Sequence, residues 1–431
     1  MQNPTQRPPL DEEKDTISGD GNEGTKSLPP PGPGTFPEGG ARAWSVVAGA
    51  MCISFCTFGY MNAYGVYQNY YSTHQLTDKS SSTIAWIGSV QTCLLLGGGI
   101  IGGPLFDRYG AIVIWPTAIT FVFSVMMTSL CKEYYQFMLA QGILGGLTCG
   151  IMFSPAMAAV SHYFHAKRGA ALGITVTGSS LGGVIFPIAL SRMFSYKSLG
   201  FEWTVRIIGF LMLALLLLAM ATIRSRLPPR KDKILLPSAF RKAAFSVFIA
   251  AQFLMLWGVF TPFFYLTEYA IARGMSEDLA SYILSILNAA SVFGRLLPGV
   301  LADKIGRFNT LCFFGFCTGI LLLCWIAIES NASIIVFAAL YGFFSGAIVS
   351  LMSPCIAHLA PSPRDIGTYL GMGMAVISLA GLTGTPITGA LIDRYTSYTP
   401  AAIFSGVSCL VGASLVFLTK VTLIRNPFRR I

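Results

Sequence analysis

Two stretches of similar sequence decide the fold: Gly103-Pro104-Leu105-Phe106-Asp107-Arg108-Tyr109-Gly110 and Gly299-Val300-Leu301-Ala302-Asp303-Lys304-Ile305-Gly306. Each follows a run of about 20 apolar residues, the length with which an α-helix crosses a hydrocarbon layer about 30 Å thick. Asp303 lies 196 positions after Asp107, and the pair Ser353-Pro354 lies 199 positions after Ser154-Pro155. Two independent landmarks at nearly one offset indicate an internal repeat whose two copies have the same orientation in the membrane.

Apolar runs of this length fill most of the chain, so we predict an all-α membrane protein with twelve transmembrane helices in two six-helix halves. The halves are residues 44–223 and 243–424, joined by a basic linker, residues 224–242. The predicted spans lie near residues 44–68, 84–106, 111–130, 136–163, 169–191, 204–223, 243–267, 279–301, 307–328, 332–359, 367–391 and 400–424.

The composition excludes several classes of protein. Of 431 residues, 53% are hydrophobic and only 11% are charged, whereas about a quarter are charged in soluble domains. The net charge of +10 comes from cations in short gaps between apolar runs, which suits membrane orientation better than nucleic-acid binding. The four His are dispersed and the ten Cys show no zinc spacing, so we expect neither a metal nor a cofactor.

Lysine and arginine counts predict the orientation, because cytosolic loops carry an excess of both. With the N-terminus inside, 21 of the 29 cations fall in segments or span ends on the cytosolic side and 6 on the other side, while Arg206 and Arg295 lie within spans. We therefore expect the tail (residues 1–43), the linker and the C-terminus (residues 425–431) in the cytosol. The tail is polar and rich in Pro and Gly, so we expect it to be disordered.

The repeated Asp-Arg/Lys-x-Gly loops resemble the signature of the major facilitator superfamily. More narrowly, the segments that begin spans 1 and 5 and end span 8 resemble the monocarboxylate porter family, in particular its fungal members. They are Pro37-Glu38-Gly39-Gly40-x-Arg42-Ala43-Trp44, Tyr163-Phe164-x-x-Lys167-Arg168-Gly169-Ala170-Ala171-x-Gly173 and Gly294-Arg295-x-x-x-Gly299 with Asp303-x-x-Gly306-Arg307-Phe308-Asn309. The resemblance covers the chain from residue 37 onward and implies the major facilitator fold.

Arg295 is the first candidate for substrate binding. An intramembrane guanidinium is costly and normally faces the bundle interior or a water-filled cavity. Asn288, Ser291 and Arg295 stand at i, i+3 and i+7 and so share one helical face. A guanidinium can grip a carboxylate with two hydrogen bonds, and the resemblance implies that the matching arginine binds the substrate anion. The alternative is an arginine that reaches the cytosolic end or fixes the Asp303 loop.

The chain also departs from the family. Its proton-coupled lactate carriers have a lysine in span 1 and an aspartate four residues before the span 8 arginine, and the aligned positions here are Asn62 and Ser291. This argues against lactate–proton symport and for a larger or less anionic substrate. Protons remain the candidate coupling ion, acting through another group.

Aromatic residues supply further candidates for the substrate site. Tyr64 in span 1 and Phe264 in span 7 are included with Asn62 in the predicted site; the alternative is an interfacial belt for Tyr64 and ordinary helix packing for Phe264. Tyr67 and Tyr71, further along the same helix face, fit an interfacial belt better.

The repeated loops supply the predicted gate. We expect inter-helix ion pairs that hold one conformation closed and that form and break during alternating access. The predicted gating residues are Asp107, Arg108, Asp303, Lys304 and Arg307.

These features predict a secondary active transporter, not an enzyme, that moves a small organic metabolite, either monocarboxylate-like or amphipathic, by rocking two halves about a central site. Loss of the Lys and Asp favours efflux of a secondary metabolite over import of a monocarboxylate or vitamin-like nutrient. A transporter-derived nutrient sensor is a remote alternative, because the tails are short. The plasma membrane is the default location.

Overall fold

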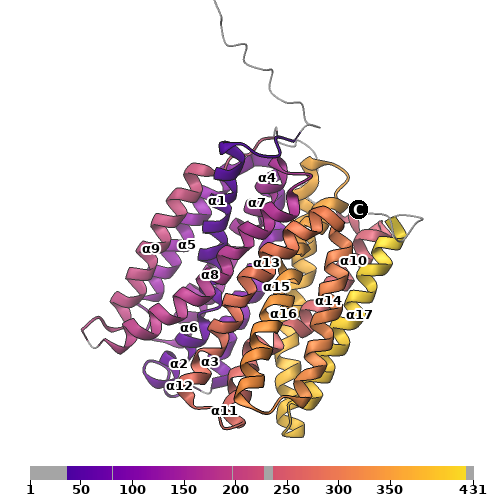
Figure 1. Ribbon diagram of the computed structural model, residues 1–431. Helices are drawn as coiled ribbons and strands as arrows, with labels where there is room; N and C mark the ends of the chain where they lie inside the picture. The colour runs from indigo at the N-terminus through magenta and orange to yellow at the C-terminus, as the bar shows by residue number, and fades with distance from the viewer. Residues whose placement is uncertain (1–35, 80, 197, 228–235, 424–431) are drawn as a thin grey trace, which may run out of the picture. The chain divides into compact units, whose positions relative to one another are not determined.

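The computed structural model describes residues 36–79, 81–196, 198–227 and 236–423, and its secondary structure there is helical (Figure 1). Within these ranges, 11 segments are long and apolar enough to cross a membrane. One of them, Trp86–Thr128, has 43 residues and covers two predicted spans. Gly110 divides it, because its φ of 69° turns the chain in a conformation that favours glycine. With that division, the segments match the twelve predicted spans.

The first half of the chain forms the helices from α1 to α9. Most of the tail, residues 1–35, lies outside the described residues, and α1 begins three residues before the predicted span. The elements are α1 Ala41–Ser54, η1 Phe55–Gly59, α2 Tyr64–Thr73, α3 Ser81–Gly97, α4 Gly99–Tyr109, η2 Gly110–Val113, α5 Ile114–Thr128, α6 Tyr134–Phe137, η3 Met138–Gly145, α7 Gly146–Tyr163, α8 Arg168–Ser195 and α9 Gly200–Thr222.

The second half forms the helices from α10 to α17, and the C-terminal residues 424–431 lie outside the described part. Its elements are η4 Pro237–Arg241, α10 Ala243–Val259, α11 Thr261–Ala272, α12 Glu277–Ser281, α13 Ile283–Ile305, α14 Arg307–Cys324, η5 Trp325–Ala327, α15 Asn331–Leu359, η6 Pro363–Asp365, α16 Ile366–Tyr395 and α17 Thr399–Leu423.

The first span of each half is interrupted at the same place in the repeat. In the first half, the break falls at Asn62 and Ala63, between the π-helix η1 and α2. In the second half it falls at Phe260, between α10 and α11, where Pro262 cannot donate a backbone hydrogen bond. Asn62 and Phe260 are 198 positions apart, so the repeat extends to the irregularities of its helices.

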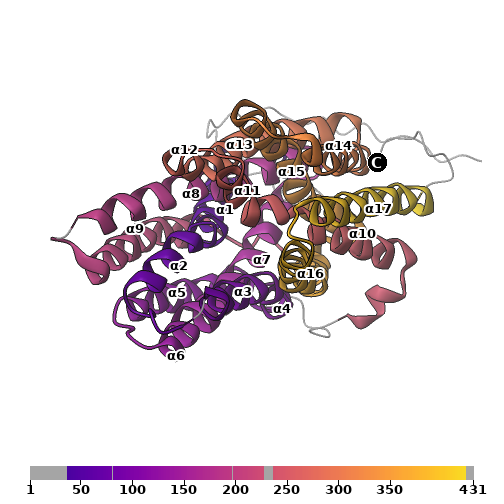
Figure 2. The same cartoon turned by 90° about the horizontal axis from the view of Figure 1, so that it is seen from below.

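The halves meet at two main interfaces (Figure 2). At one, α8 packs on α13; at the other, α16 packs on α3 and α4. Glycines allow these close approaches. A methyl group on Gly371 in α16 would overlap the Gly99 carbonyl oxygen in α4, and one on Gly169 in α8 would lie 2.5 Å from the Gly299 oxygen in α13. Small residues let helix backbones approach closely in membranes.

The prediction of an interfacial belt at Tyr67 and Tyr71 is wrong. Both side chains are fully buried, and they pack against Phe194, Phe137 and Phe201. The Tyr71 hydroxyl donates to Gln141 Oε1 at 2.7 Å. These rings fix α2 to its own half, because the aromatic residues of α6, α8 and α9 surround them.

Candidate functional site

The ends of α4 and α13 that carry the two repeated aspartates lie at the same end of the bundle, which we call the linker end because residues 224–227 and 236–242 are also there (Figure 1). Asp107, at the end of α4, accepts hydrogen bonds from Gly367 N at 3.2 Å, Thr368 N at 2.6 Å and Thr368 Oγ1 at 2.7 Å. Asp303, near the end of α13, accepts from Gly169 N and Ala170 N, both at 2.8 Å. Each carboxylate thus caps the first turn of a helix in the other half, where free amides and the helix dipole favour negative charge.

One inter-helix ion pair is present among the predicted gating residues. Arg307 Nε, in α14, lies 3.8 Å from Asp303 Oδ1, in α13 of the same half, and Arg307 also donates to the His165 carbonyl of the first half. Arg108 lies over its neighbour Tyr109, with 5.6 Å from Cζ to the ring centroid. Both Arg108 and Lys304 are exposed. In this conformation, carboxylate-to-amide hydrogen bonds link Asp107 and Asp303 to the opposite half.

The segment before α1 supports the same end of the bundle. Glu38 accepts from His165 N and Ala166 N, both at 2.7 Å, and from Lys167 N at 3.1 Å. Burial raises the pKa of the Glu38 carboxyl, but the three amides outweigh burial and hold the pKa below its usual value. The loop between α7 and α8 is therefore fixed from both sides, by Glu38 in its own half and by Asp303 and Arg307 in the other.

Asn288, Ser291 and Arg295 share one face of α13, as predicted, and we call them the Arg295 row. Arg295 is only 4% exposed; its Nη1 donates to the Val176 carbonyl of α8 at 2.9 Å and to Ser179 Oγ. Ser291 Oγ lies 2.6 Å from Ser180 Oγ, also in α8. The row therefore faces the other half and is sealed by it.

Two atoms of this row lack hydrogen-bond partners. Arg295 Nε and Asn288 Oδ1 are buried without one, although Asn288 Nδ2 donates to the Leu284 carbonyl at 3.0 Å. Asn288 is 3% exposed. A buried polar group without a partner is costly, so a donor and an acceptor are available here to a ligand that enters when the halves separate.

Asn62 joins the row at the break in the first span. A methyl group on Gly183 of α8 would lie 2.8 Å from Asn62 Nδ2 and 2.9 Å from Asn288 Oδ1. Gly183 thus leaves room for the amide groups of both asparagines. The structure places Asn62 and Ser291 in this one region.

The other two predicted site residues lie apart from the row. The Tyr64 hydroxyl donates to the Ile84 carbonyl at 2.6 Å, so its ring packs on α3. Phe264 is 56% exposed on α11. Nothing in the sequence singles out Ser179 and Ser180, because they lie in a Gly- and Ser-rich stretch of α8 that is typical of close helix packing.

Comparison with known proteins places the chain among transporters. A family model described as Major Facilitator Superfamily matches residues 46–362 and 299–427. The aspyridones efflux protein apdF of Emericella nidulans is 55% identical over 385 residues, 89% of this chain and 79% of that protein. The agnestins efflux protein AgnL12 of Paecilomyces divaricatus is 42% identical over 387 residues, 88% of this chain and 87% of that protein.

A solved structure shares the fold. The proton:xylose symporter XylE superposes with a TM-score of 0.71 at 14% identity, covering 87% of this chain and 95% of the symporter. At this identity, the likeness supports the fold alone.

Proposed function

Because the chain belongs to the major facilitator superfamily, a family of integral multi-pass membrane transporters, we propose that it exports a small organic metabolite by alternating access. The two halves, residues 44–223 and 243–424, would move about the α4–α16 and α8–α13 interfaces and expose the Arg295 row to each side in turn. One observation carries this proposal: a buried arginine bonded across the division between the halves. Separating the halves breaks those bonds and leaves a guanidinium for a ligand.

The substrate we propose carries an acidic group together with a hydrogen-bond donor. Arg295 would take the anion, as in the monocarboxylate porter family that the motifs resemble, with protons as the coupling ion. Asn288 Oδ1, an unpartnered acceptor two helical turns away, would take the donor. Asn62 adds a neutral amide rather than a second positive charge, which favours a larger amphipathic acid over lactate. The names of the efflux relatives support a secondary metabolite.

We further propose that the linker end faces the cytosol and that the membrane is the plasma membrane. The excess of Lys and Arg on that side supports the orientation. Both aspartate caps are formed at the linker end, so this conformation would be closed toward the cytosol. Export requires the caps to open to admit the substrate.

Replacement of Arg295 tests the proposal. The native host is compared with its deletion strain and with strains that carry Arg295→Gln or Arg295→Lys, and acidic metabolites are measured inside cells and in the medium. A hydrogen bond to a charged group contributes about 1.5–3 kcal/mol, so Arg295→Gln should lower export of the affected metabolite by about tenfold or more at normal protein level. Arg295→Lys should be intermediate, because it keeps the charge but not the planar geometry.

A second intramembrane arginine provides the control. Arg206 in α9 is bonded to Ser129 Oγ and lies 3.6 Å from Glu202, within its own half, so Arg206→Gln should leave export unchanged. Normal export by Arg295→Gln would contradict the assigned role of Arg295. If deletion instead lowered the uptake of an external acid, the import alternative would replace export.

A further inference from the structure

At the end of the bundle opposite the linker, each half contains a cavity. The C-rim pocket, of about 240 Å³, is lined by residues that include Tyr269, Arg273, Trp325, Thr396, Tyr398 and Thr399. The N-rim pocket, of about 520 Å³, is lined by residues that include Gln75, Ser129, Lys132, Phe201, Glu202 and Trp203.

The repeat relates the two pockets. Arg273 lies 198 positions after Gln75, Trp325 lies 196 positions after Ser129, and Tyr398 lies 197 positions after Phe201. These offsets agree with those of the repeated motifs. The two cavities are therefore the same feature of the fold with different side chains, and a difference between them is not imposed by the fold.

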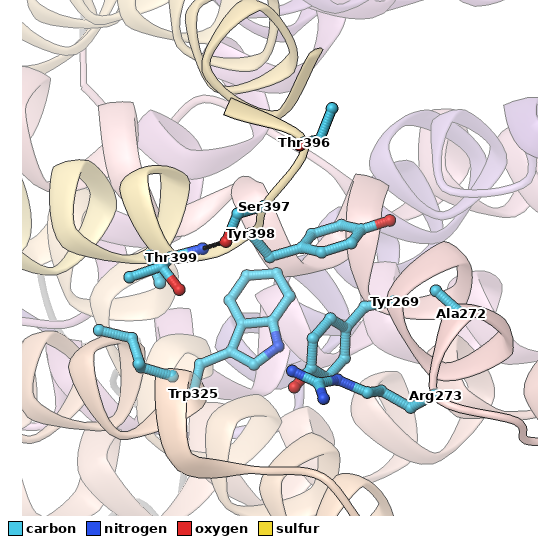
Figure 3. Close-up of a pocket in the computed structure, with 10 residues that line it drawn as sticks. Tyr269, Ala272, Arg273, Trp325, Thr396, Ser397, Tyr398 and Thr399 are labelled. Carbon is cyan, nitrogen blue, oxygen red and sulfur yellow. Dashed lines mark hydrogen bonds between the residues drawn. The ribbon is translucent and has the colours of Figure 1, made fainter. Parts of the chain in front are cut away.

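Three aromatic rings line the C-rim pocket (Figure 3). The ring centroid of Tyr269 is 5.5 Å from that of Trp325 and 5.0 Å from that of Tyr398, and the latter two are 6.3 Å apart. Tyr269 is held in place because its hydroxyl donates to the Ile328 carbonyl. Tyr269 and Trp325 are 2% and 1% exposed, so these rings pack mainly on one another and present only their edges to the cavity, beside the half-buried ring of Tyr398.

Hydrogen-bond donors lie beside these rings. The Arg273 side chain is 40% exposed, and its Nη1 lies 3.2 Å from Glu329 Oε1. A guanidinium has five N–H donors, so this contact leaves others available. Trp325 is 1% exposed and its indole N–H has no hydrogen-bond partner. Figure 3 shows the indole nitrogen on the edge of the ring toward Tyr269 and Arg273.

The other polar groups of the pocket set its charge. Hydroxyl groups of Thr396 and Thr399 line it. Burial, and then the nearby Glu268 carboxylate, raise the pKa of Tyr398 to about 12, so this residue presents a neutral hydroxyl. Among the side chains that the structure describes, Glu268 lies near Tyr398 and Glu329 lies beside Arg273, so Glu329 already occupies part of the guanidinium. A carboxylate ligand must compete with Glu329 for the guanidinium.

We propose that the C-rim pocket binds a small aromatic carboxylic acid, with its ring against Tyr269, Trp325 and Tyr398 and its carboxylate at Arg273 and the Trp325 N–H. The volume limits the ligand, because drug-sized molecules usually occupy about 300–1,000 Å³, so a single-ring acid fits. In the N-rim pocket, Gln75 and Ser129 take the positions of Arg273 and Trp325, and its cation and indole come from other positions, Lys132 and Trp203. This site is separate from the Arg295 row and does not depend on the proposed transport.

Benzoate is the probe for this site, with benzamide as an uncharged molecule of the same shape. Binding is measured by isothermal titration calorimetry on the purified full-length protein. Arg273→Gln installs the residue that the repeat has at position 75, and it should weaken benzoate binding about tenfold. Trp325→Phe keeps the ring but removes the N–H, so it should weaken binding a few-fold. Benzamide should bind the wild type about tenfold more weakly than benzoate does.

A variant that should bind benzoate more tightly distinguishes a specific effect from misfolding. Glu329→Gln removes the competitor for Arg273 and should tighten benzoate binding, which a damaged protein cannot do. Arg206→Gln should leave the affinity unchanged, because Arg206 lies in the other half, bonded to Ser129. The proposal is overturned if the wild type does not bind benzoate at millimolar concentration, if Arg273→Gln binds as the wild type does, or if Arg206→Gln removes binding.

Discussion

The α4–α16 and α8–α13 interfaces between the halves are two copies of one arrangement. In both, an aspartate near the end of one helix, α4 or α13, caps the start of its partner, α16 or α8, and glycines bring the backbones together. The difference lies two turns before each aspartate. Arg295 is 196 positions after Gly99, the same offset as between Asp303 and Asp107. The α4–α16 interface therefore has Gly99 against Gly371, whereas the α8–α13 interface has Arg295, bonded to α8, at the equivalent position.

We propose that this difference separates a mechanical role from a binding role. The features that both interfaces share, glycine contacts and aspartate caps, are needed to hold the halves together at the linker end. The feature found in one alone, the Arg295 row, supplies polar groups that packing does not need. The two aspartate caps also differ. Thr368 donates a hydroxyl hydrogen bond to Asp107, whereas the equivalent residue in the other cap, Ala170, has no hydroxyl. Arg307 lies beside Asp303, whereas the equivalent residue near Asp107 is Ala111.

The largest expected effect is that of Asp303→Asn. The change removes a charged acceptor from two amides and leaves the buried Arg307 without its carboxylate. Removing one partner of a buried pair costs about 3 kcal/mol or more, so the amides of residues 164–172 should exchange with solvent over a hundredfold faster, as measured by hydrogen-exchange mass spectrometry.

Asp107→Asn removes a charged acceptor from Gly367 N and from the amide and hydroxyl of Thr368 and should cost about 2 kcal/mol, at residues 362–370. Combining Asp303→Asn with Arg307→Gln should reduce the effect of the first change. Equal effects of the two single aspartate changes would show that Arg307 adds nothing to the cap of Asp303.

An intermediate effect is expected for Gly371→Ala. The new methyl group would overlap the Gly99 carbonyl, and both atoms belong to backbone that cannot turn aside. Overpacking of this kind costs about 1–3 kcal/mol, so the melting temperature in detergent should fall and the α4–α16 interface should exchange faster. The matched control is Gly65→Ala, because a methyl group there meets nothing within 4 Å. If both variants behave alike, close approach is not what the glycine provides.

The smallest expected effect is that of Thr368→Ala. This change places an alanine in the cap of Asp107, as Ala170 is in the cap of Asp303. It removes one hydroxyl hydrogen bond of 2.7 Å and should cost about 1 kcal/mol, seen as roughly fivefold faster exchange at the start of α16. The reverse change, Ala170→Thr, offers Asp303 a third donor and should slow exchange at the start of α8. No change in either variant would mean that the backbone amides alone determine the strength of the caps.

Much of this arrangement could be predicted from the sequence. Apolar runs gave the spans, and the offset of the two aspartate motifs gave the repeat, because both depend on local composition and spacing. Helical periodicity placed Asn288, Ser291 and Arg295 on one face. The contacts of that face could not be predicted in this way, because Ser179 and Ser180 are remote in sequence and look like ordinary packing residues.

The partners of the gating aspartates show the same limit. The charges of Asp107, Asp303 and Arg307 suggested ion pairs, because a sequence distinguishes residues only by their side chains. The structure instead pairs both carboxylates with backbone amides of a helix in the other half, and amides are present at every non-proline residue. The prediction that Tyr67 and Tyr71 belong to an interfacial belt was wrong for a similar reason, because the burial of a ring depends on which helices surround it.

The sequence by itself determined that this chain crosses a membrane repeatedly, in two similarly oriented halves with one arginine within the eighth span. Hydrocarbon imposes these features on each segment separately. Only the tertiary structure decided what the arginine touches, that a glycine leaves room for the amide groups of Asn62 and Asn288, and that two rim cavities with unlike linings are related by the repeat. Such contacts join residues more than a hundred positions apart, and their free energy depends on the packing of whole helices.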